Sequence, residues 1–241
     1  MTDSSKVFLS AKWRNLVFLN YAVEPELLRP FVPSGTALDS FGGKTYVSLV
    51  GFRFCETKLW GKVTVPFHSQ FEEANLRFYV RRESDGELRR GVVFIKEIVP
   101  KSAIALTARL IYGENYVSLP MSHKISISEA GIDAEYSWKH KRAWSRIHAR
   151  ASGAGKMPVE GSLEQYITEH YWGYSRQKSG RTIEYRVTHL PWSVQHTSEA
   201  QFEGKASALY GAEFAAVLSR LPDSAQIASG SPIEVLTGST V

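Results

Sequence analysis

The chain has 241 residues, of which 43% are hydrophobic and 22% charged, as in an ordinary globular protein. Its single cysteine excludes an intramolecular disulfide framework and suits a reducing compartment. The net charge of +5 is too small to predict a nucleic-acid partner, and no window approaches the ~20 consecutive apolar residues of a membrane helix. Residues 1–14 lack the apolar segment of a secretory signal. We therefore expect a cytoplasmic protein with one domain over residues 1–241 and no membrane partner.

The first half of the chain is predicted to be mostly strand. The expected strands cover residues 16–23, 44–56, 70–82 and 87–99. A short helix over residues 25–30 lies between two prolines. The pair Asp85-Gly86 predicts a two-residue hairpin turn. Apolar spacing then predicts a helix over residues 102–112, with Ser102 as its N-cap.

The second half continues with strands and two more helices. Strands are expected to begin at residues 125, 134, 144, 172, 182 and 193, with two short strands at the C-terminus. The basic run 139–142 is interpreted as a solvated loop between two of them. Ser162 and Gln165 form a capping box that opens a helix, and an apolar stripe over residues 210–221 predicts another. These elements predict an α+β fold, mainly antiparallel β, forming a single-domain barrel or cone with a few covering helices.

The strand over residues 71–80 carries the most informative polar side chains. Alternation places Glu73, Asn75, Arg77 and Tyr79 on one face and apolar residues on the other. A carboxylate, an amide, a guanidinium and a phenol together are typical of a ligand cavity inside a barrel. An ordinary solvent-facing surface is the alternative, because alternation alone does not distinguish the two.

The same hairpin brings a lysine into the hypothesis. A turn at Asp85-Gly86 would place Lys96 opposite Asn75, diagonally between Glu73 and Arg77. A lysine beside an arginine in a dry cavity tends to be uncharged, the state that favours Schiff-base chemistry, whereas a neighbouring carboxylate would keep it charged. A surface ion pair is equally compatible with the pattern. Glu73 and Lys96 are thus the candidate catalytic residues.

Further candidate ligand-binding residues lie outside this hairpin. They are Arg109, Tyr112, Tyr116, His189 and Trp192. An arginine in an apolar helix either binds a carboxylate or extends to water, so Arg109 has two interpretations. His189 is a candidate general base, whereas His170 is expected to be a core histidine. No glycine-rich phosphate loop, Gly-x-Ser-x-Gly motif or zinc-ligand spacing is present, so we expect no cofactor and no metal.

Several stretches resemble the uncharacterised conserved family DUF2071, the YqjF-like proteins. They are Trp13–Pro33, Leu38-Asp39, Gly43 with Tyr46–Val50, Glu73-x-Asn75-x-Arg77-x-Tyr79-Val80, Gly91-Val92, Ala108-Arg109 with Tyr112 and Tyr116, and His189-x-Pro191-Trp192. The resemblance covers residues 13–192 and implies the acetoacetate decarboxylase-like fold, a β-cone with an internal active site. One departure is visible, because Glu169-His170-Tyr171 stands where family members often have Glu-Arg-Tyr.

The resemblance does not imply the decarboxylase mechanism. In the decarboxylase a lysine pair supplies the Schiff-base nucleophile, and the corresponding region here, residues 108–116, contains no lysine. Kinship at the level of the fold does not establish function.

Three functions are consistent with this sequence. The first is an enzyme, lyase- or hydrolase-like, acting on a small keto or carboxylic acid: Arg77 or Arg109 holds the anion, Glu73 transfers a proton and Tyr79 orients it. The second is a non-catalytic sensor or carrier that binds a small-molecule ligand in the same cavity. The third is a structural module whose polar strand face forms a homo-oligomer interface.

Overall fold

The computed structural model describes residues 6–60, 63–64 and 69–241. The first strands are β1 (Val7–Val23), β2 (Ala37–Leu38), β3 (Thr45–Leu59), β4 (Val63–Thr64), β5 (Phe71–Ser84), β6 (Glu87–Val99), β7 (Tyr116–Ser118) and β8 (Met121–Ser128). The later strands are β9 (Gly131–His140), β10 (Ala143–Ser152), β11 (Trp172–Arg176), β12 (Thr182–His189), β13 (Val194–Glu203), β14 (Ser224–Ala228), β15 (Pro232–Leu236) and β16 (Ser239–Thr240). The helices are α1 (Pro25–Leu28), the 3₁₀ turn η1 (Arg29–Phe31), α2 (Ser102–Ile111), α3 (Leu163–Thr168), α4 (Ser207–Tyr210) and α5 (Ala212–Leu218).

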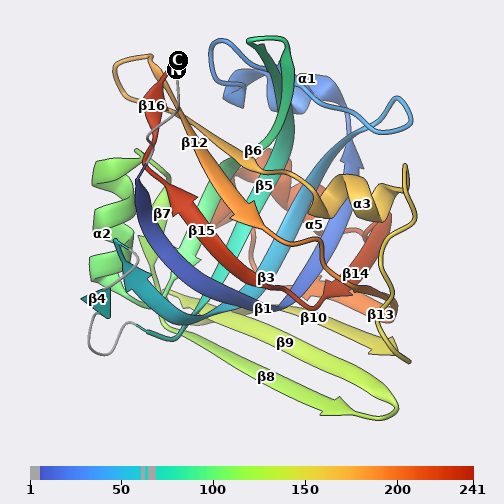
Figure 1. Cartoon of the computed structure of the whole chain (residues 1–241). Coiled ribbons are helices and arrows are strands. Elements are labelled where there is room, and N and C mark those ends of the chain that lie inside the picture. Colours follow the sequence, from blue (N-terminus) through green and yellow to red (C-terminus); the bar gives the residue numbers. More distant parts are fainter. Residues whose placement is uncertain (1–5, 61–62, 65–68) are drawn as a thin grey trace.

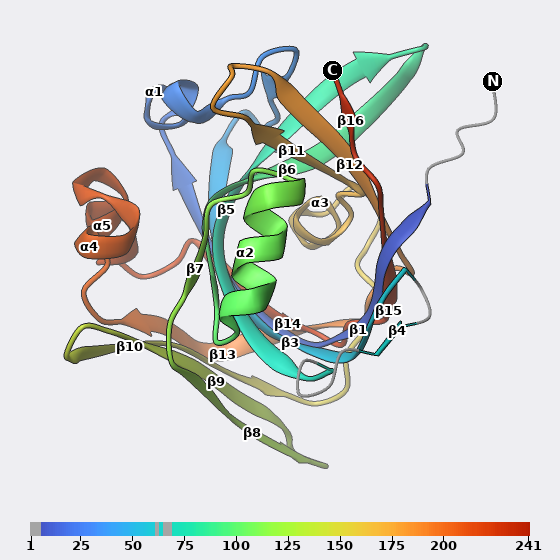
Figure 2. The same ribbon diagram turned by 90° about the vertical axis from the view of Figure 1, so that its left-hand side faces the viewer.

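The central sheet closes on itself. From β3 the pairing runs through β5, β6, β11, β12 and β15 to β1, and β1 also pairs with β3 over most of its length. Among the described pairs only β6–β11 and β6–β7 are parallel. Figure 1 shows the strands curling round a common interior, and Figure 2 shows α2 in front of one end of it. The predicted mainly antiparallel β fold with a few helices is confirmed.

A second layer packs on the outside of this barrel. The latter half of β1 pairs with β14, and the sheet continues through β13, β10 and β9 to β8. This layer, which crosses beneath the barrel in Figure 1, buries Trp138 and Ile147 against Leu49, Leu76 and Phe78. The outer face of β5 is therefore a core as well, so between residues 73 and 80 neither face of this strand meets bulk water.

The β5–β6 hairpin has the predicted turn. Asp85 and Gly86 adopt φ angles of 54° and 77°, both in the left-handed region, which a type I′ turn requires. The register from this turn to the pair Arg77–Phe94 is the predicted one.

Beyond that pair the register shifts by one residue. A bulge between Leu76 and Arg77 places Lys96 opposite Leu76 and Glu97 opposite Asn75. The prediction that Lys96 faces Asn75 is therefore wrong. A bulge adds one residue to one strand and reverses which side chains face inward, and alternation in the sequence does not reveal it.

Other predicted elements agree in place and differ in length. Of the basic run 139–142, predicted to be a loop, residues 141–142 form the exposed turn between β9 and β10, whereas Lys139 and His140 end β9. Ser162 caps α3 by accepting from the Gln165 backbone N–H at 3.3 Å, but α3 ends at Thr168. The helix predicted through residue 221 is two short helices, because Gly211 with φ of 89° separates α4 from α5. Among the described residues no helix is long and apolar enough to cross a membrane.

Candidate functional site

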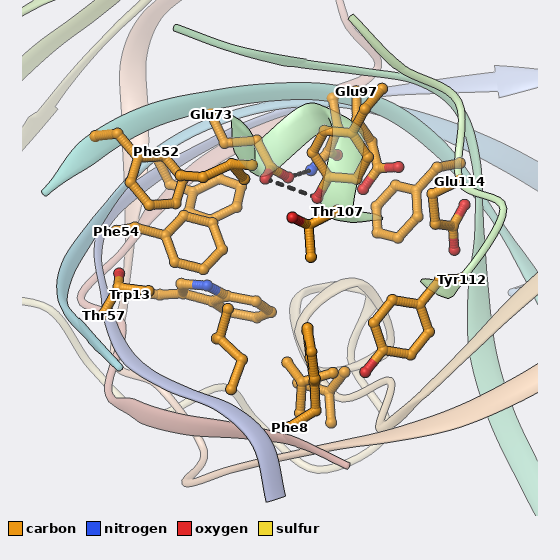
Figure 3. Close-up of a pocket in the computed structure, with 18 of the residues that line it drawn as sticks. Phe8, Trp13, Phe52, Phe54, Thr57, Glu73, Glu97, Thr107, Tyr112 and Glu114 are labelled. Atoms are coloured by element: carbon orange, nitrogen blue, oxygen red, sulfur yellow. Dashed lines mark hydrogen bonds between the residues drawn. The ribbon is translucent and has the colours of Figure 1, made fainter. Parts of the chain in front are cut away.

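The interior of the barrel holds a cavity of about 210 Å³. Its walls are mostly apolar and come from β1, β3, β5, β6, α2, β12 and β15. Figure 3 shows Trp13, Phe52 and Phe54 on one side and carboxyl groups gathered on another. The apolar lining comprises Phe8, Leu9, Trp13, Leu16, Phe52, Phe54, Leu59, Phe71, Phe94, Ala103, Ile104, Val187 and Val235. Such a mixture of apolar walls and a few convergent polar groups is typical of a small-molecule site.

Glu73 is a buried carboxyl group of the cavity, and both of its oxygens accept hydrogen bonds. It is 3% exposed; its Oε1 accepts from Asn75 Nδ2 at 2.9 Å and its Oε2 from the Tyr116 hydroxyl at 3.1 Å (Figure 3). Burial raises the pKa of Glu73 to about 7, against the lowering effect of these two hydrogen bonds and of the Arg77 charge. This carboxyl group therefore exchanges its proton near neutral pH.

Two further buried carboxyl groups line the cavity. Burial and the nearby charges of Glu114 and Glu73 raise the pKa of Glu97 well above its usual range. Burial raises the pKa of Glu114 to about 8, although its Oε1 accepts from the Tyr185 hydroxyl at 2.9 Å. Burial therefore favours the protonated form of both carboxyl groups. Among the described residues no group of three or more acidic, histidine or cysteine side chains is arranged to hold a metal.

Arg77 supplies the positive charge of the cavity. Its side chain lies against the ring of Phe18, 5.1 Å from guanidinium carbon to ring centroid, and Nη2 donates to the Ile167 carbonyl at 3.4 Å. The residue is 8% exposed, and Nε has no hydrogen-bond partner among the described residues. Within the described part of the chain Arg77 forms no ion pair. A buried guanidinium without a counter-ion is costly, and an anionic ligand would offset that cost.

The structure thus brings five of the predicted residues to one cavity. They are Glu73, Asn75, Arg77, Tyr112 and Tyr116. The Tyr112 hydroxyl donates a hydrogen bond to the Leu236 carbonyl at 3.2 Å. Burial raises the pKa of Tyr112 and of Tyr116. The inward polar face of β5 is enclosed, as predicted, and is not a solvent-facing surface.

Tyr79 and Lys96 lie outside the cavity lining. The Ser48 hydroxyl donates its proton to Asn20 Oδ1 at 2.6 Å. The Tyr79 hydroxyl, 2.6 Å from Ser48 Oγ, is therefore the donor to Ser48 Oγ. Among the described residues, the hydrogen bonds that Glu73 accepts come from Asn75 and Tyr116 and not from Tyr79. Lys96 donates from Nζ to Asn115 Oδ1 at 2.7 Å, on the other face of the sheet, because of the bulge.

The remaining candidates also lie elsewhere. The His189 ring stacks on Trp192 at 4.2 Å, and burial lowers the pKa of His189 to about 4. Trp192 packs behind Trp13 and donates to Ser231 Oγ at 2.9 Å, one layer away from the cavity. His170 is the expected core histidine, 3.8 Å from Asp39, and burial lowers its pKa. The side chain of Arg109 lies outside the described part of the chain.

Reasoning from sequence missed Glu97, Glu114 and Tyr185, which line the cavity together with Thr57 and Thr107. The bulge, which the sequence does not reveal, brings Glu97 to the cavity face opposite Asn75. Glu114 and Tyr185 come from a loop and a distant strand that meet only in the closed barrel. The one available signal was the position of Glu114 between Tyr112 and Tyr116.

Comparison with known proteins shows the family to which this chain belongs. A profile of DUF2071, described as an uncharacterized conserved protein, matches residues 10–232. The chain belongs to the DUF2071 family. The uncharacterized protein YqjF of Bacillus subtilis (strain 168) is 27% identical over 188 residues, which cover 76% of this chain and 74% of YqjF.

Solved structures share the fold of this DUF2071 protein. An acetoacetate decarboxylase-like enzyme from Sphingomonas wittichii RW1 has a TM-score of 0.67 at 12% identity, covering 97% of this chain and 92% of that one. The enduracididine biosynthesis enzyme MppR complexed with pyruvate has a TM-score of 0.65 at 14% identity, covering 96% and 90%. Acetoacetate decarboxylase from Legionella pneumophila has a TM-score of 0.61 at 14% identity, covering 96% and 86%. The family and the acetoacetate decarboxylase-like fold predicted from sequence are both confirmed.

Proposed function

We propose that this DUF2071 protein is an enzyme that binds a small keto acid in the cavity and transfers a proton at the carbon next to its carbonyl group. The observation that carries the proposal is the buried guanidinium of Arg77, which lines the cavity beside Glu73 and has no counter-ion among the described residues. A structure of similar fold, that of MppR, holds pyruvate, itself a small keto acid, which supports the proposal.

Arg77 has the chemistry to hold the ligand carboxylate. A guanidinium presents two parallel N–H groups to a carboxylate, and the bond is strong where water is excluded. Repulsion from the three glutamates is limited, because burial favours the protonated forms of Glu97 and Glu114. The apolar walls would surround the rest of a small ligand.

Glu73 has the properties of the proton-transfer group. A pKa of about 7 makes the carboxylate and the carboxylic acid nearly equally populated at neutral pH, the best compromise for general acid–base catalysis. In the step, the C–H bond next to the carbonyl breaks and its proton passes to the Glu73 carboxylate. The electron pair of that bond moves to the carbonyl oxygen as an enolate. Schiff-base chemistry is not supported, because the described lining residues include no lysine.

Exchange of ligand protons with solvent tests this function. In D2O, ¹H NMR would follow loss of the C3 protons of 2-oxobutanoate, with and without the protein. We expect Glu73→Gln to slow the catalysed exchange by about 10²–10⁴-fold. Arg77→Met should mainly raise KM. The matched controls are Glu83→Gln and Arg81→Met, exposed positions on the same strand, which should behave as the wild type.

Two outcomes would contradict the proposal. Exchange with the wild type no faster than in buffer, at any concentration of 2-oxobutanoate, refutes the catalytic role. Saturable, Arg77-dependent binding of 2-oxobutanoate without any proton exchange would refute the enzyme and favour a non-catalytic carrier.

A further inference from the structure

Two side-chain oxygens of the cavity have no hydrogen-bond partner among the described residues. They are Oδ1 of Asn75 and Oε2 of Glu97, on residues 1% and 2% exposed. The two residues face each other across the β5–β6 pair, and both line the cavity. Buried polar atoms in proteins are nearly always paired, so two unpaired oxygens on one wall indicate a polar group that comes with the ligand.

We propose that the ligand carries, in addition to its carboxylate, an ammonium group that binds between Glu97 and Asn75. This inference rests on the proposed function, because it uses the same cavity and the same arginine. The ligand class is a small keto acid that also carries an amino group, with an apolar body between its two charged groups.

The spacing of the binding groups sets the spacing in the ligand. Asn75 and Arg77 are alternate residues of β5, and at about 3.3 Å per residue their Cα atoms are about 6.6 Å apart along the strand. The long Arg77 side chain can shorten or lengthen this span. An amine several bonds away from the carboxylate fits it better than an amine on the adjacent carbon.

Electrostatics favour a cationic donor over a neutral one. Glu73, Glu97 and Glu114 all line this cavity, and burial raises the pKa of each carboxyl group, so the protonated form of Glu97 is favoured before the ligand binds. An ammonium placed beside Glu97 stabilises its carboxylate form, so Glu97 gives up its proton and an ion pair forms. Binding of the cation therefore releases a proton, which a hydroxyl or neutral amide donor would not do.

Calorimetry with matched ligands tests the inference on the wild-type protein. The probes are 4-(aminomethyl)benzoate against 4-ethylbenzoate, and 4-aminobutanoate against pentanoate, in which a methyl group replaces the ammonium. We expect an amino-carboxylate to bind at least tenfold more tightly than its methyl counterpart. We also expect release of up to one proton at pH 7, detected as a binding enthalpy that differs between phosphate and Tris buffers.

Glu97→Gln identifies the binding group. It should reduce the preference for the amine to less than twofold and abolish proton release, while binding of 4-ethylbenzoate or pentanoate persists. Glu87→Gln, an exposed position on the same strand, is the matched control and should keep both properties. Circular dichroism and urea titration establish that each variant is folded. The measurement of proton release on the wild type does not depend on either variant.

The result that overturns this inference differs from the one that overturns the proposed function. Methyl-terminated carboxylates that bind in an Arg77-dependent manner, with no preference for either amine and no proton release, refute the ammonium site and leave the carboxylate site intact. If no carboxylate of either pair binds, and Arg77→Met changes nothing, then the carboxylate site and this inference both fail.

Discussion

The buried carboxyl group of Glu73 makes the stability of this protein depend on pH, and Glu73→Gln isolates that dependence. Glutamine is close in shape to the protonated acid and is neutral at every pH. Its side chain can still accept from Asn75 Nδ2 and face the Tyr116 hydroxyl. The variant therefore removes the ionisation while retaining most of the packing.

The magnitude follows from the raised pKa. Below pH 4.5 the group is protonated in the folded and unfolded chains alike, and ionisation contributes nothing. Between pH 4.5 and about 7 the folded chain keeps a proton that the unfolded chain has released, so the free energy of unfolding falls as pH rises. Above pH 7 the free energy of unfolding has fallen by about 3 kcal/mol relative to its value below pH 4.5, at ~1.4 kcal/mol per unit of pKa difference.

Urea titrations of the wild type and Glu73→Gln at pH 4.5, 6, 7 and 8.5 measure this difference. The free energy of unfolding of the variant should exceed that of the wild type by about 3 kcal/mol more at pH 8.5 than at pH 4.5. Glu83→Gln, exposed on the same strand, should follow the wild type. A difference between Glu73→Gln and wild type that is constant with pH would refute a neutral, buried Glu73.

Three further substitutions test the packing and charge of the cavity by urea titration. Arg77→Met replaces a buried, unpaired cation by an apolar side chain, and should raise the free energy of unfolding by about 1–4 kcal/mol while binding of carboxylates is lost; a destabilised variant would contradict the account. Gly173→Ala places a methyl group against the ring of Tyr185, so it should cost about 1–3 kcal/mol, and no cost would mean the two do not touch. Phe54→Ala removes the partner of a stacked pair with Phe71, at 4.6 Å between centroids, and should cost about 3 kcal/mol, whereas a cost under 1 kcal/mol would contradict the packed wall.

Much of the fold could be predicted because local signals and the overall architecture agree. Alternation along β5 separated its two faces correctly, and Asp85-Gly86 fixed both the turn and the register of its first rungs. Ser162 marked the start of α3. Helix ends were less certain: Gly211 divides one predicted helix into two, since its left-handed backbone interrupts the turn.

The position of the candidate site followed most directly from the residues that share one strand. Glu73, Asn75 and Arg77 were found together because two-residue spacing keeps them on one face. Lys96 was placed wrongly, and Glu97 was missed, for the same reason: one additional residue in β6 exchanges their positions. Glu114 and Tyr185 meet through barrel closure, which brings distant segments together without any local sequence signal. The cytoplasmic location and the homo-oligomer remain predictions.

The central claim is that Arg77 binds a small carboxylate inside the barrel. The most direct measurement is a crystal structure of the protein grown with 4-ethylbenzoate. The account predicts the carboxylate within hydrogen-bond distance of the Arg77 guanidinium, with the ring between Trp13, Phe54 and Phe94. Two results would contradict it. One is a crystal in which 4-ethylbenzoate is bound outside the barrel. The other is a crystal in which Arg77 forms an ion pair with a carboxylate of the protein and side chains fill the cavity.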